Sequence, residues 1–138
     1  MAIRFSNDCS TLSLSQLSGF FQEWPSPPPA ETLLRILQRS SYSVIATEDS
    51  TFQVVGYIVA LSDGMISAFV PMLEVLPPYR HQGIGSALVR RMMNNLKSLP
   101  VIDLVCNVTL SSFYRGQDFS RYLAKVQYQY CPNSFLAQ

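Results

Sequence analysis

The feature that most constrains this chain is an apolar stretch that leads through a proline turn and two glycines into a helix pattern. Residues 73–88 read LEVLPPYRHQGIGSAL. The first N–H groups of a helix have no partner inside it and carry partial positive charge, so they bind anions. Glycines let a pyrophosphate approach the backbone without meeting a Cβ atom. This order of strand, glycine turn and helix start therefore predicts a phosphate cradle.

A surface helix packed on a sheet is predicted over residues 83–99, and Pro100 ends its pattern. Ser86 falls in the first turn, where its hydroxyl can also reach a phosphate. The apolar side chains recur four residues apart, at Ile84, Leu88, Met92 and Leu96.

Other glycine motifs fit this stretch less well. A Walker loop needs Gly-Lys-Ser/Thr, and a Rossmann start needs a third glycine and an earlier strand. Two glycines alone are also compatible with a tight strand-to-helix connection that binds nothing. Pro77, Tyr79, Arg80 and the phase of the helix favour the cradle over that alternative.

The six residues from Arg80 to Gly85, RHQGIG, resemble motif A of the Gcn5-related N-acetyltransferases, the GNAT superfamily. In that family the consensus Arg/Gln-x-x-Gly-x-Gly/Ala holds the pyrophosphate of acetyl-coenzyme A (acetyl-CoA). The resemblance implies cofactor binding by the turn and by the strand end before it, at Val75, Leu76, Arg80, His81, Gln82, Gly83, Ile84, Gly85 and Ser86.

Residues 107–119 resemble the later motif of the same family, which spaces Asn, Ala, Phe-Tyr and Gly-Phe. Leu110 replaces the alanine, and Asp118 replaces the glycine. Asp tolerates a left-handed helix cap better than most residues, though less well than Gly. Asn107 either binds the cofactor or caps the next helix. The positions that match in register are Asn107, Phe113, Tyr114 and Phe119.

The periodicities predict a strand, two helices, three strands, and then a helix, a strand, a helix and a strand. This order mixes hairpins with one parallel crossover, so we expect an α/β fold with a central mixed sheet flanked by helices. We expect the strands at residues 3–5, 42–47, 52–61, 65–76, 101–107 and 121–130. We expect the helices at residues 11–23, 30–39, 83–99 and 110–119.

The order of elements is also that of the GNAT fold, so the resemblance implies a single GNAT domain over residues 1–138. It further implies that the parallel strands ending near Val75 and Asn107 splay apart at the cofactor site. Pro71 cannot donate to a sheet ladder, so it marks an edge, a bulge or the end of a pairing. The sequence Ser62-Asp63-Gly64 is a strong hairpin signal.

The reaction that the resemblance implies is direct attack of an amine on the acetyl thioester. An amine of pKa ~10.4 is only about 0.04% neutral at pH 7, so a base or a desolvating pocket must help. Glu74 either points into a cleft as that base or is held in a structural salt bridge. By resemblance Tyr114 protonates the departing thiolate, and otherwise it is a core tyrosine. Asp63 is a turn residue or binds a cationic amine at the cleft mouth.

We therefore expect an acetyl-CoA-dependent N-acetyltransferase acting on a primary amine of a small molecule or a protein. The phosphate cradle does not distinguish acetyl from other acyl donors. The alternative from another class is a non-catalytic acyl-CoA-binding sensor or regulatory module. Dimers are common in the family, so a homodimer is expected from the resemblance alone.

Composition argues against several other classes. A net charge of +1 gives no electrostatic footprint for nucleic acid, and no apolar run has membrane-spanning length. The first five residues lack the apolar core of a signal peptide. The three cysteines, Cys9, Cys106 and Cys131, have no CxxC spacing and predict neither disulfides nor a zinc site. We expect a cytoplasmic protein without a metal.

Overall fold

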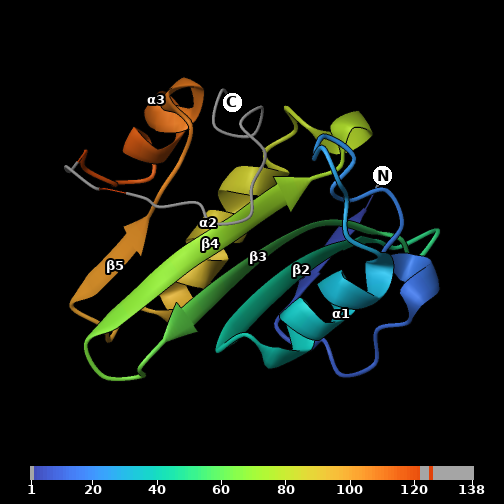
Figure 1. The fold of residues 1–138 in the computed structure, drawn as a ribbon, viewed down its shortest axis with the longest axis horizontal. Coiled ribbons are helices and arrows are strands. Elements are labelled where there is room, and N and C mark those ends of the chain that lie inside the picture. Colours follow the sequence, from blue (N-terminus) through green and yellow to red (C-terminus); the bar gives the residue numbers. More distant parts are fainter. Residues whose placement is uncertain (1, 122–124, 126–138) are drawn as a thin grey trace.

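A computed structural model describes residues 2–121 and 125 of the chain. Its strands form a mixed sheet in the order β1-β2-β3-β4-β5 (Figure 1). Neighbouring strands are antiparallel except for β4 and β5, which are parallel. The strands are β1 Ile3–Ser6, β2 Tyr42–Glu48, β3 Val54–Ser62, β4 Ser67–Val75 and β5 Val101–Leu104.

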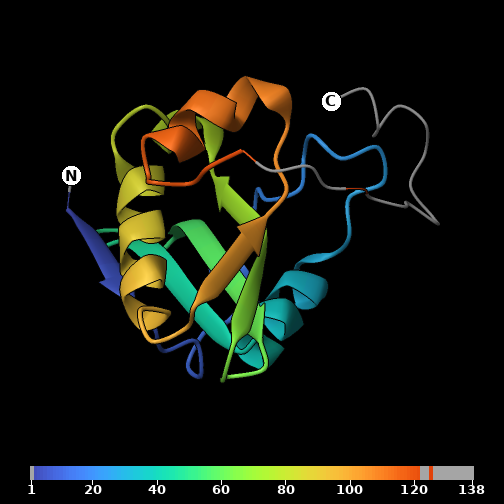
Figure 2. The same ribbon diagram turned by 90° about the vertical axis from the view of Figure 1, so that its left-hand side faces the viewer.

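Helices cover both faces of the sheet. Figure 2 shows α1 (Ala30–Arg39) and α2 (Ile84–Asn95) on opposite sides, with α3 (Ser111–Arg115) over the end of the sheet where β4 finishes. Every helix in the described residues is too short or too polar to span a lipid bilayer. The mixed sheet flanked by helices is the predicted fold class, which is confirmed.

Two apolar cores lie on the two faces of the sheet, and β3 contributes to both. All residues from Val54 to Ala60 are buried, as expected for a central strand covered on both sides. Leu88 and Met92 of α2 are fully buried in one core, and Leu33 of α1 is fully buried in the other. We call the two faces the α2 face and the α1 face.

The helix predicted over residues 11–23 is wrong. The segment contains only the 3-10 turn Leu14–Gln16 and then runs through left-handed residues at Gly19 (φ 95°) and Phe21 (φ 65°). Left-handed residues end a right-handed helix, so the pattern cannot propagate. Leu17 and Phe21 are nevertheless only 2% exposed. The helical spacing on which the prediction rested also includes Leu14 and Trp24, which are 41% and 38% exposed. The spacing therefore predicted burial for only half of these residues, and it predicted the wrong conformation.

The other predicted elements agree with the structure within a few residues, with two exceptions. β5 ends at Leu104 instead of continuing to residue 107. The helix predicted over residues 110–119 is divided into the 3-10 helix Val108–Leu110 and the short α3. The closing strand predicted over residues 121–130 lies outside the described residues, apart from positions 121 and 125.

The sheet opens in the second half of β4. The parallel pairing of β4 with β5 ends where Val70 faces Leu104, one residue before Pro71. The register with β3 also shifts here, so that Val70 and Pro71 together lie opposite Ala60 in a β-bulge. Residues 71–75 consequently have no strand partner on the β5 side within the described chain. The expectation that Pro71 marks a bulge and the end of a pairing is confirmed.

A test of this packing concerns Gly56, because β3, β4 and α2 converge on it. A Cβ atom there would lie 3.2 Å from both the Glu74 carbonyl oxygen and Leu88 Cδ1, and 3.3 Å from Val75 Cγ2. We expect Gly56→Ala to lower the free energy of unfolding by about 1–3 kcal/mol, measured by urea titration. Met65→Ala, at an exposed hairpin position, should change it by less than about 0.5 kcal/mol. Equal stability of the two variants would contradict this packing.

Candidate active site

The glycine turn presents a row of unpaired backbone amides. Gly83 is left-handed (φ 85°) and precedes α2, and its carbonyl accepts the N–H of Ala87 as the first bond of the helix. The N–H groups of residues 82–86 have no hydrogen-bond acceptor within the part of the chain that the structure describes. The first turn of α2 also contains no acidic side chain. Within the described residues, the positive end of this helix therefore has no protein anion bonded to its amides, as an anion site requires.

His81 and Gln82 contribute to the turn through their backbone. His81 is exposed and left-handed (φ 63°), a conformation in which His is found more often than most residues. The Gln82 side-chain amide donates to the Pro78 carbonyl oxygen at 3.3 Å, so that side chain helps to close the turn.

Leu76 does not face the open edge of β4, contrary to the expectation that it binds the cofactor. Its N–H donates to the Val55 carbonyl oxygen at 2.8 Å, and its side chain is buried in the α1-face core. Because backbone groups alternate in direction along a strand, the N–H and C=O of Val75 point to the other side, toward the open edge. Of this pair, it is therefore Val75 that turns its backbone groups toward the open edge.

Arg80 is bonded to protein atoms instead of standing free beside the glycines. Its Nε donates to the Val75 carbonyl oxygen at 2.8 Å, and its Nη1 forms an ion pair with Glu23 at 2.9 Å. The side chains of Arg80 and Glu23 are 36% and 68% exposed. Exposed pairs of this kind contribute about 0–1 kcal/mol, so a polyanionic ligand can compete for the guanidinium.

Gly85 lies where β4, α2 and α3 meet. A Cβ atom on Gly85 would lie 3.7 Å from Phe113 Cζ and 3.9 Å from Val75 Cγ2. These are ordinary contact distances, so the missing Cβ leaves space next to the open strand edge. The residues of the second motif are thereby brought to the end of the sheet that carries the glycine turn.

Tyr114 is partly buried on α3, at the margin of the α2-face core. Its ring packs edge-on against Phe113 and Phe119, with centroid distances of 4.9 and 5.8 Å. Burial, with a smaller contribution from Cys106, raises the pKa of the Tyr114 phenol to about 12. The phenol therefore keeps its proton at neutral pH and can donate a hydrogen bond.

The loops around α3 contain two residues that the sequence analysis singled out, Asp118 and Asn107. Asp118 is left-handed (φ 67°), so it takes the conformation expected where the family has glycine. The Asn107 side chain accepts the Thr109 N–H at 3.1 Å and caps the 3-10 helix Val108–Leu110. Of the two roles considered for Asn107, the structure shows helix capping, and cofactor binding stays a prediction.

Glu74 lies on the α1 face and is held by neutral donors. One carboxylate oxygen accepts the Tyr57 hydroxyl at 3.2 Å, and the other accepts the Phe21 N–H at 3.1 Å. It forms no salt bridge with any described residue. Burial raises the pKa of Glu74, and the two hydrogen bonds and the charge of Arg80 oppose that rise only in part. The salt-bridge alternative is therefore not what the structure shows.

Neither donor to Glu74 was expected from the sequence. Tyr57 carries the one side-chain polar atom in the buried run VVGYIVA. Its isolation in this apolar strand is the sequence signal that could have identified Tyr57 as a functional residue. The Phe21 N–H could not be predicted as a donor because residues 11–23 were predicted to be helical, and a helical N–H is bonded to the carbonyl four residues earlier.

Asp63 is far from Glu74 and from the glycine turn. It lies in the β3–β4 hairpin, at the opposite end of β4 from the glycine turn. Its carboxylate accepts three backbone N–H groups at 2.8 to 3.1 Å, which is the turn role considered for it. The structure does not place Asp63 beside Glu74 or Tyr114.

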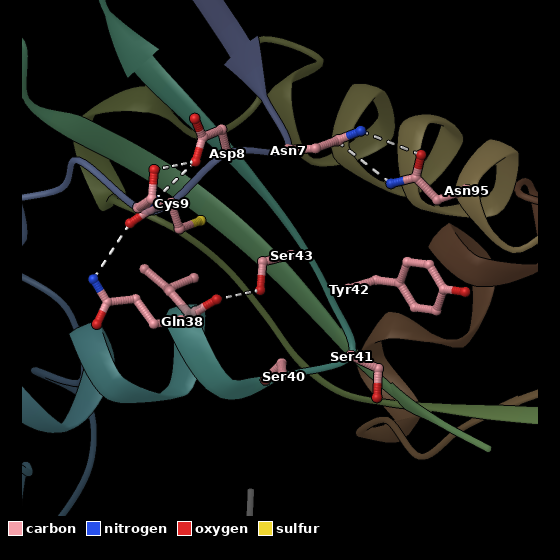
Figure 3. A pocket seen from close by; sticks show the side chains of 11 residues that line it. Asn7, Asp8, Cys9, Gln38, Ser40, Ser41, Tyr42, Ser43 and Asn95 are labelled. Carbon is pink, nitrogen blue, oxygen red and sulfur yellow. Dashed lines mark hydrogen bonds between the residues drawn. The ribbon is translucent and has the colours of Figure 1, made fainter. Parts of the chain in front are cut away.

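Figure 3 shows residues that line a cavity of about 650 Å³, and none of the lining residues belongs to the glycine turn. It lies between the loop after β1, the end of α1 and the start of β2, and its polar side chains largely bond one another or the backbone. Burial, with a contribution from Asp8, raises the pKa of the Cys9 thiol on its wall to about 11. In the described part of the chain, no group of three or more His, Cys, Asp or Glu side chains could hold a metal ion.

The structure and the sequence both resemble known acetyltransferases. A proposed acetyltransferase from Deinococcus radiodurans R1 is 39% identical, with 93% of this chain and 89% of that chain covered and a TM-score of 0.89. A GNAT family acetyltransferase from Streptococcus pneumoniae TIGR4 is 27% identical, with 94% and 98% covered and a TM-score of 0.71. No curated protein sequence matches this chain.

A more distant structure shares the fold alone. AAC(6')-Iy, in complex with the bisubstrate analogue CoA-S-monomethyl-acetylneamine, is 20% identical, with 94% and 98% covered and a TM-score of 0.68. The model of the acetyltransferase (GNAT) family matches residues 10–124. Since this match spans most of the chain and agrees with the open mixed sheet and the glycine turn, the protein belongs to the GNAT acetyltransferase family.

Proposed function

We propose that the protein transfers an acetyl group from acetyl-CoA to a primary amine of a small molecule or a protein by direct attack. The observation that supports this most strongly is that, among the described residues, a strand edge without a neighbouring strand lies next to a row of amides without acceptors, with the Val75 carbonyl between them bonded to Arg80. The open edge of β4 over residues 71–75 leads directly into the unpaired amides of residues 82–86. An elongated ligand with an amide-containing arm and a diphosphate is chemically complementary to both.

Each part of the surface suits one part of acetyl-CoA. The open edge of β4 offers backbone groups to the pantetheine amides, as a sheet edge does to an added strand, although the Val75 carbonyl there is bonded to Arg80. The amides of residues 82–86, helped by the Ser86 hydroxyl, suit the diphosphate. To bind the diphosphate, Arg80 must exchange its contact with Glu23, which costs little because that pair is exposed.

Glu74 is suited to accept the proton of the amine. A neutral alkyl amine is scarce at pH 7, and generating it costs about 4–5 kcal/mol. The carboxylate faces the loop that contains Phe21 and Glu23, so we place the acceptor on the α1 face, next to this loop. A carboxylate whose pKa is raised by burial is a stronger base than an exposed one.

Tyr114 is suited to stabilise the departing sulfur. Its pKa of about 12 lies roughly three to four units above the ~8.5 of a thiol, so complete proton transfer to a thiolate runs uphill. We therefore propose that the phenol donates a hydrogen bond to the developing thiolate, which solvent then protonates. Tyr114 packs on the α2 face, so the proposed proton acceptor and donor lie on opposite faces of the β4 edge.

The experiment that tests the function is thiol release from acetyl-CoA over a panel of polyamines, aminoglycosides, amino acids and peptide N-termini. Release that depends on the amine supports the proposal, and mass spectrometry of the product shows whether nitrogen is acetylated. Binding of acetyl-CoA without release across the panel supports the sensor instead. Homodimer formation and a cytoplasmic location stay predictions from the sequence.

Ser86→Asp should separate folding from cofactor binding. An acid in the first turn of α2 favours the helix dipole, so we expect unchanged or slightly higher thermal stability. The same charge repels a diphosphate, so we expect the Kd for CoA to rise at least about tenfold in calorimetry. The uncharged Ser86→Asn is the matched control and should bind more nearly like the wild type. Equal affinity of all three proteins would place the diphosphate elsewhere.

Tyr114→Phe should slow turnover without weakening cofactor binding. A hydrogen bond to a charged group contributes about 1.5–3 kcal/mol, so we expect kcat to fall about ten- to a hundredfold. The Kd for CoA should stay within about twofold. Tyr42→Phe removes a phenol from β2, in the wall of the remote cavity, and is the control. A Tyr114→Phe enzyme with wild-type kcat would remove Tyr114 from the mechanism.

A further inference from the structure

Tyr57 places a hydroxyl in the middle of an otherwise apolar strand. Its side chain is 1% exposed, and its neighbours from Val54 to Ala60 carry no other side-chain polar atom. A buried hydroxyl needs a hydrogen-bond partner, and Tyr57 finds it in Glu74 at 3.2 Å. The two residues are also direct cross-strand neighbours in the β3–β4 pairing.

The ring and the carboxylate are both fixed by their surroundings. Phe20 packs edge-on against the Tyr57 ring, with the centroids 5.2 Å apart and the planes at 75°. The second Glu74 oxygen accepts the N–H of the left-handed Phe21. Each carboxylate oxygen therefore has one donor, one from β3 and one from the loop before α1.

We propose that Tyr57 is a positioning residue for Glu74, orienting its carboxylate toward the acceptor and keeping it ionised in a partly buried site. This inference rests on the proposed function, in which Glu74 accepts the proton of the amine. Tyr57 itself takes no part in proton transfer. Its hydroxyl donates a hydrogen bond to Glu74, and the packing of the core fixes the position of its ring.

The charges around Glu74 agree with this role. Burial raises the pKa of Glu74, the donors Phe21 and Tyr57 and the charge of Arg80 lower it, and the carboxylate of Glu23 raises it. The pKa of the Tyr57 phenol lies well above its ordinary value because of burial and the nearby Glu74. The phenol therefore stays protonated and remains a donor throughout the pH range of an assay.

The test is the pH profile of kcat/KM for Tyr57→Phe. This variant keeps the ring and removes only the hydroxyl donor, so the pKa of Glu74 rises. As the pH falls, Glu74 is then protonated, and its activity as a base is lost, at a higher pH than in the wild type. We expect kcat/KM at pH 7 to fall at least about tenfold and the acid limb of the pH profile to move to higher pH. At pH values above the shifted limb, part of the lost kcat/KM should be recovered. If Tyr57 only stabilised the fold, Tyr57→Phe would lower kcat/KM by the same factor at every pH.

Two controls make the test specific. Tyr79→Phe removes the same type of phenol-to-carboxylate hydrogen bond, from Glu48 on β2, and should leave the acid limb in place. In a Glu74→Gln background, Tyr57→Phe should cost no further activity, because the group it serves is absent. A full additional loss there, or an unmoved acid limb in the single variant, would overturn the proposal.

A readout without turnover distinguishes this inference from the proposed function. In protein labelled with ¹³C-glutamate, the Glu74 carboxyl signal is assigned by its loss in Glu74→Gln and titrated by NMR. Tyr57→Phe should move its midpoint to higher pH even if no amine is acetylated. A wild-type enzyme that releases no thiol contradicts the proposed function, whereas an unchanged Glu74 midpoint contradicts the role of Tyr57.

Discussion

The separation of β4 from β5 at Pro71 is the constraint on which the rest of the site depends. The bulge at Val70 and Pro71 ends the parallel pairing while β4 is still held by β3 on its other side. Backbone groups left unpaired in a dry core would cost about 1–3 kcal/mol each, so such an edge persists only where water or a ligand can reach it. Among the described residues, the fold thus leaves this edge of β4 without a strand partner while β3 holds its other side.

The alternation of side chains along β4 distributes the chemistry over two faces. Glu74 points to the α1 face, where Tyr57 and Phe21 hold it, and Val75 points to the α2 face beside Gly85. Two consecutive residues therefore lie in different environments. In the proposed function, Glu74 acts on the acceptor amine and Tyr114 acts on the leaving thiolate. Each of these groups has its own environment and its own raised pKa.

The sequence predicted what is local and missed what depends on tertiary pairing. The glycine turn, α2 and the left-handed Asp118 follow from short-range rules on helix starts and glycine conformations. The Tyr57 contact depends on the register of β3 against β4, which the sequence does not show. Arg80 was expected at the phosphate site, but it bonds Val75 and Glu23, and Glu23 belongs to the segment whose conformation was predicted wrongly.

Amide hydrogen exchange measured by NMR tests the central claim most directly. The N–H groups of residues 82–86 should exchange rapidly in the free protein and be protected when CoA is added, whereas the Ala87 N–H, already bonded to Gly83, should be protected in both states. Protection of these amides before CoA is added, or no change at saturating CoA, would contradict the account.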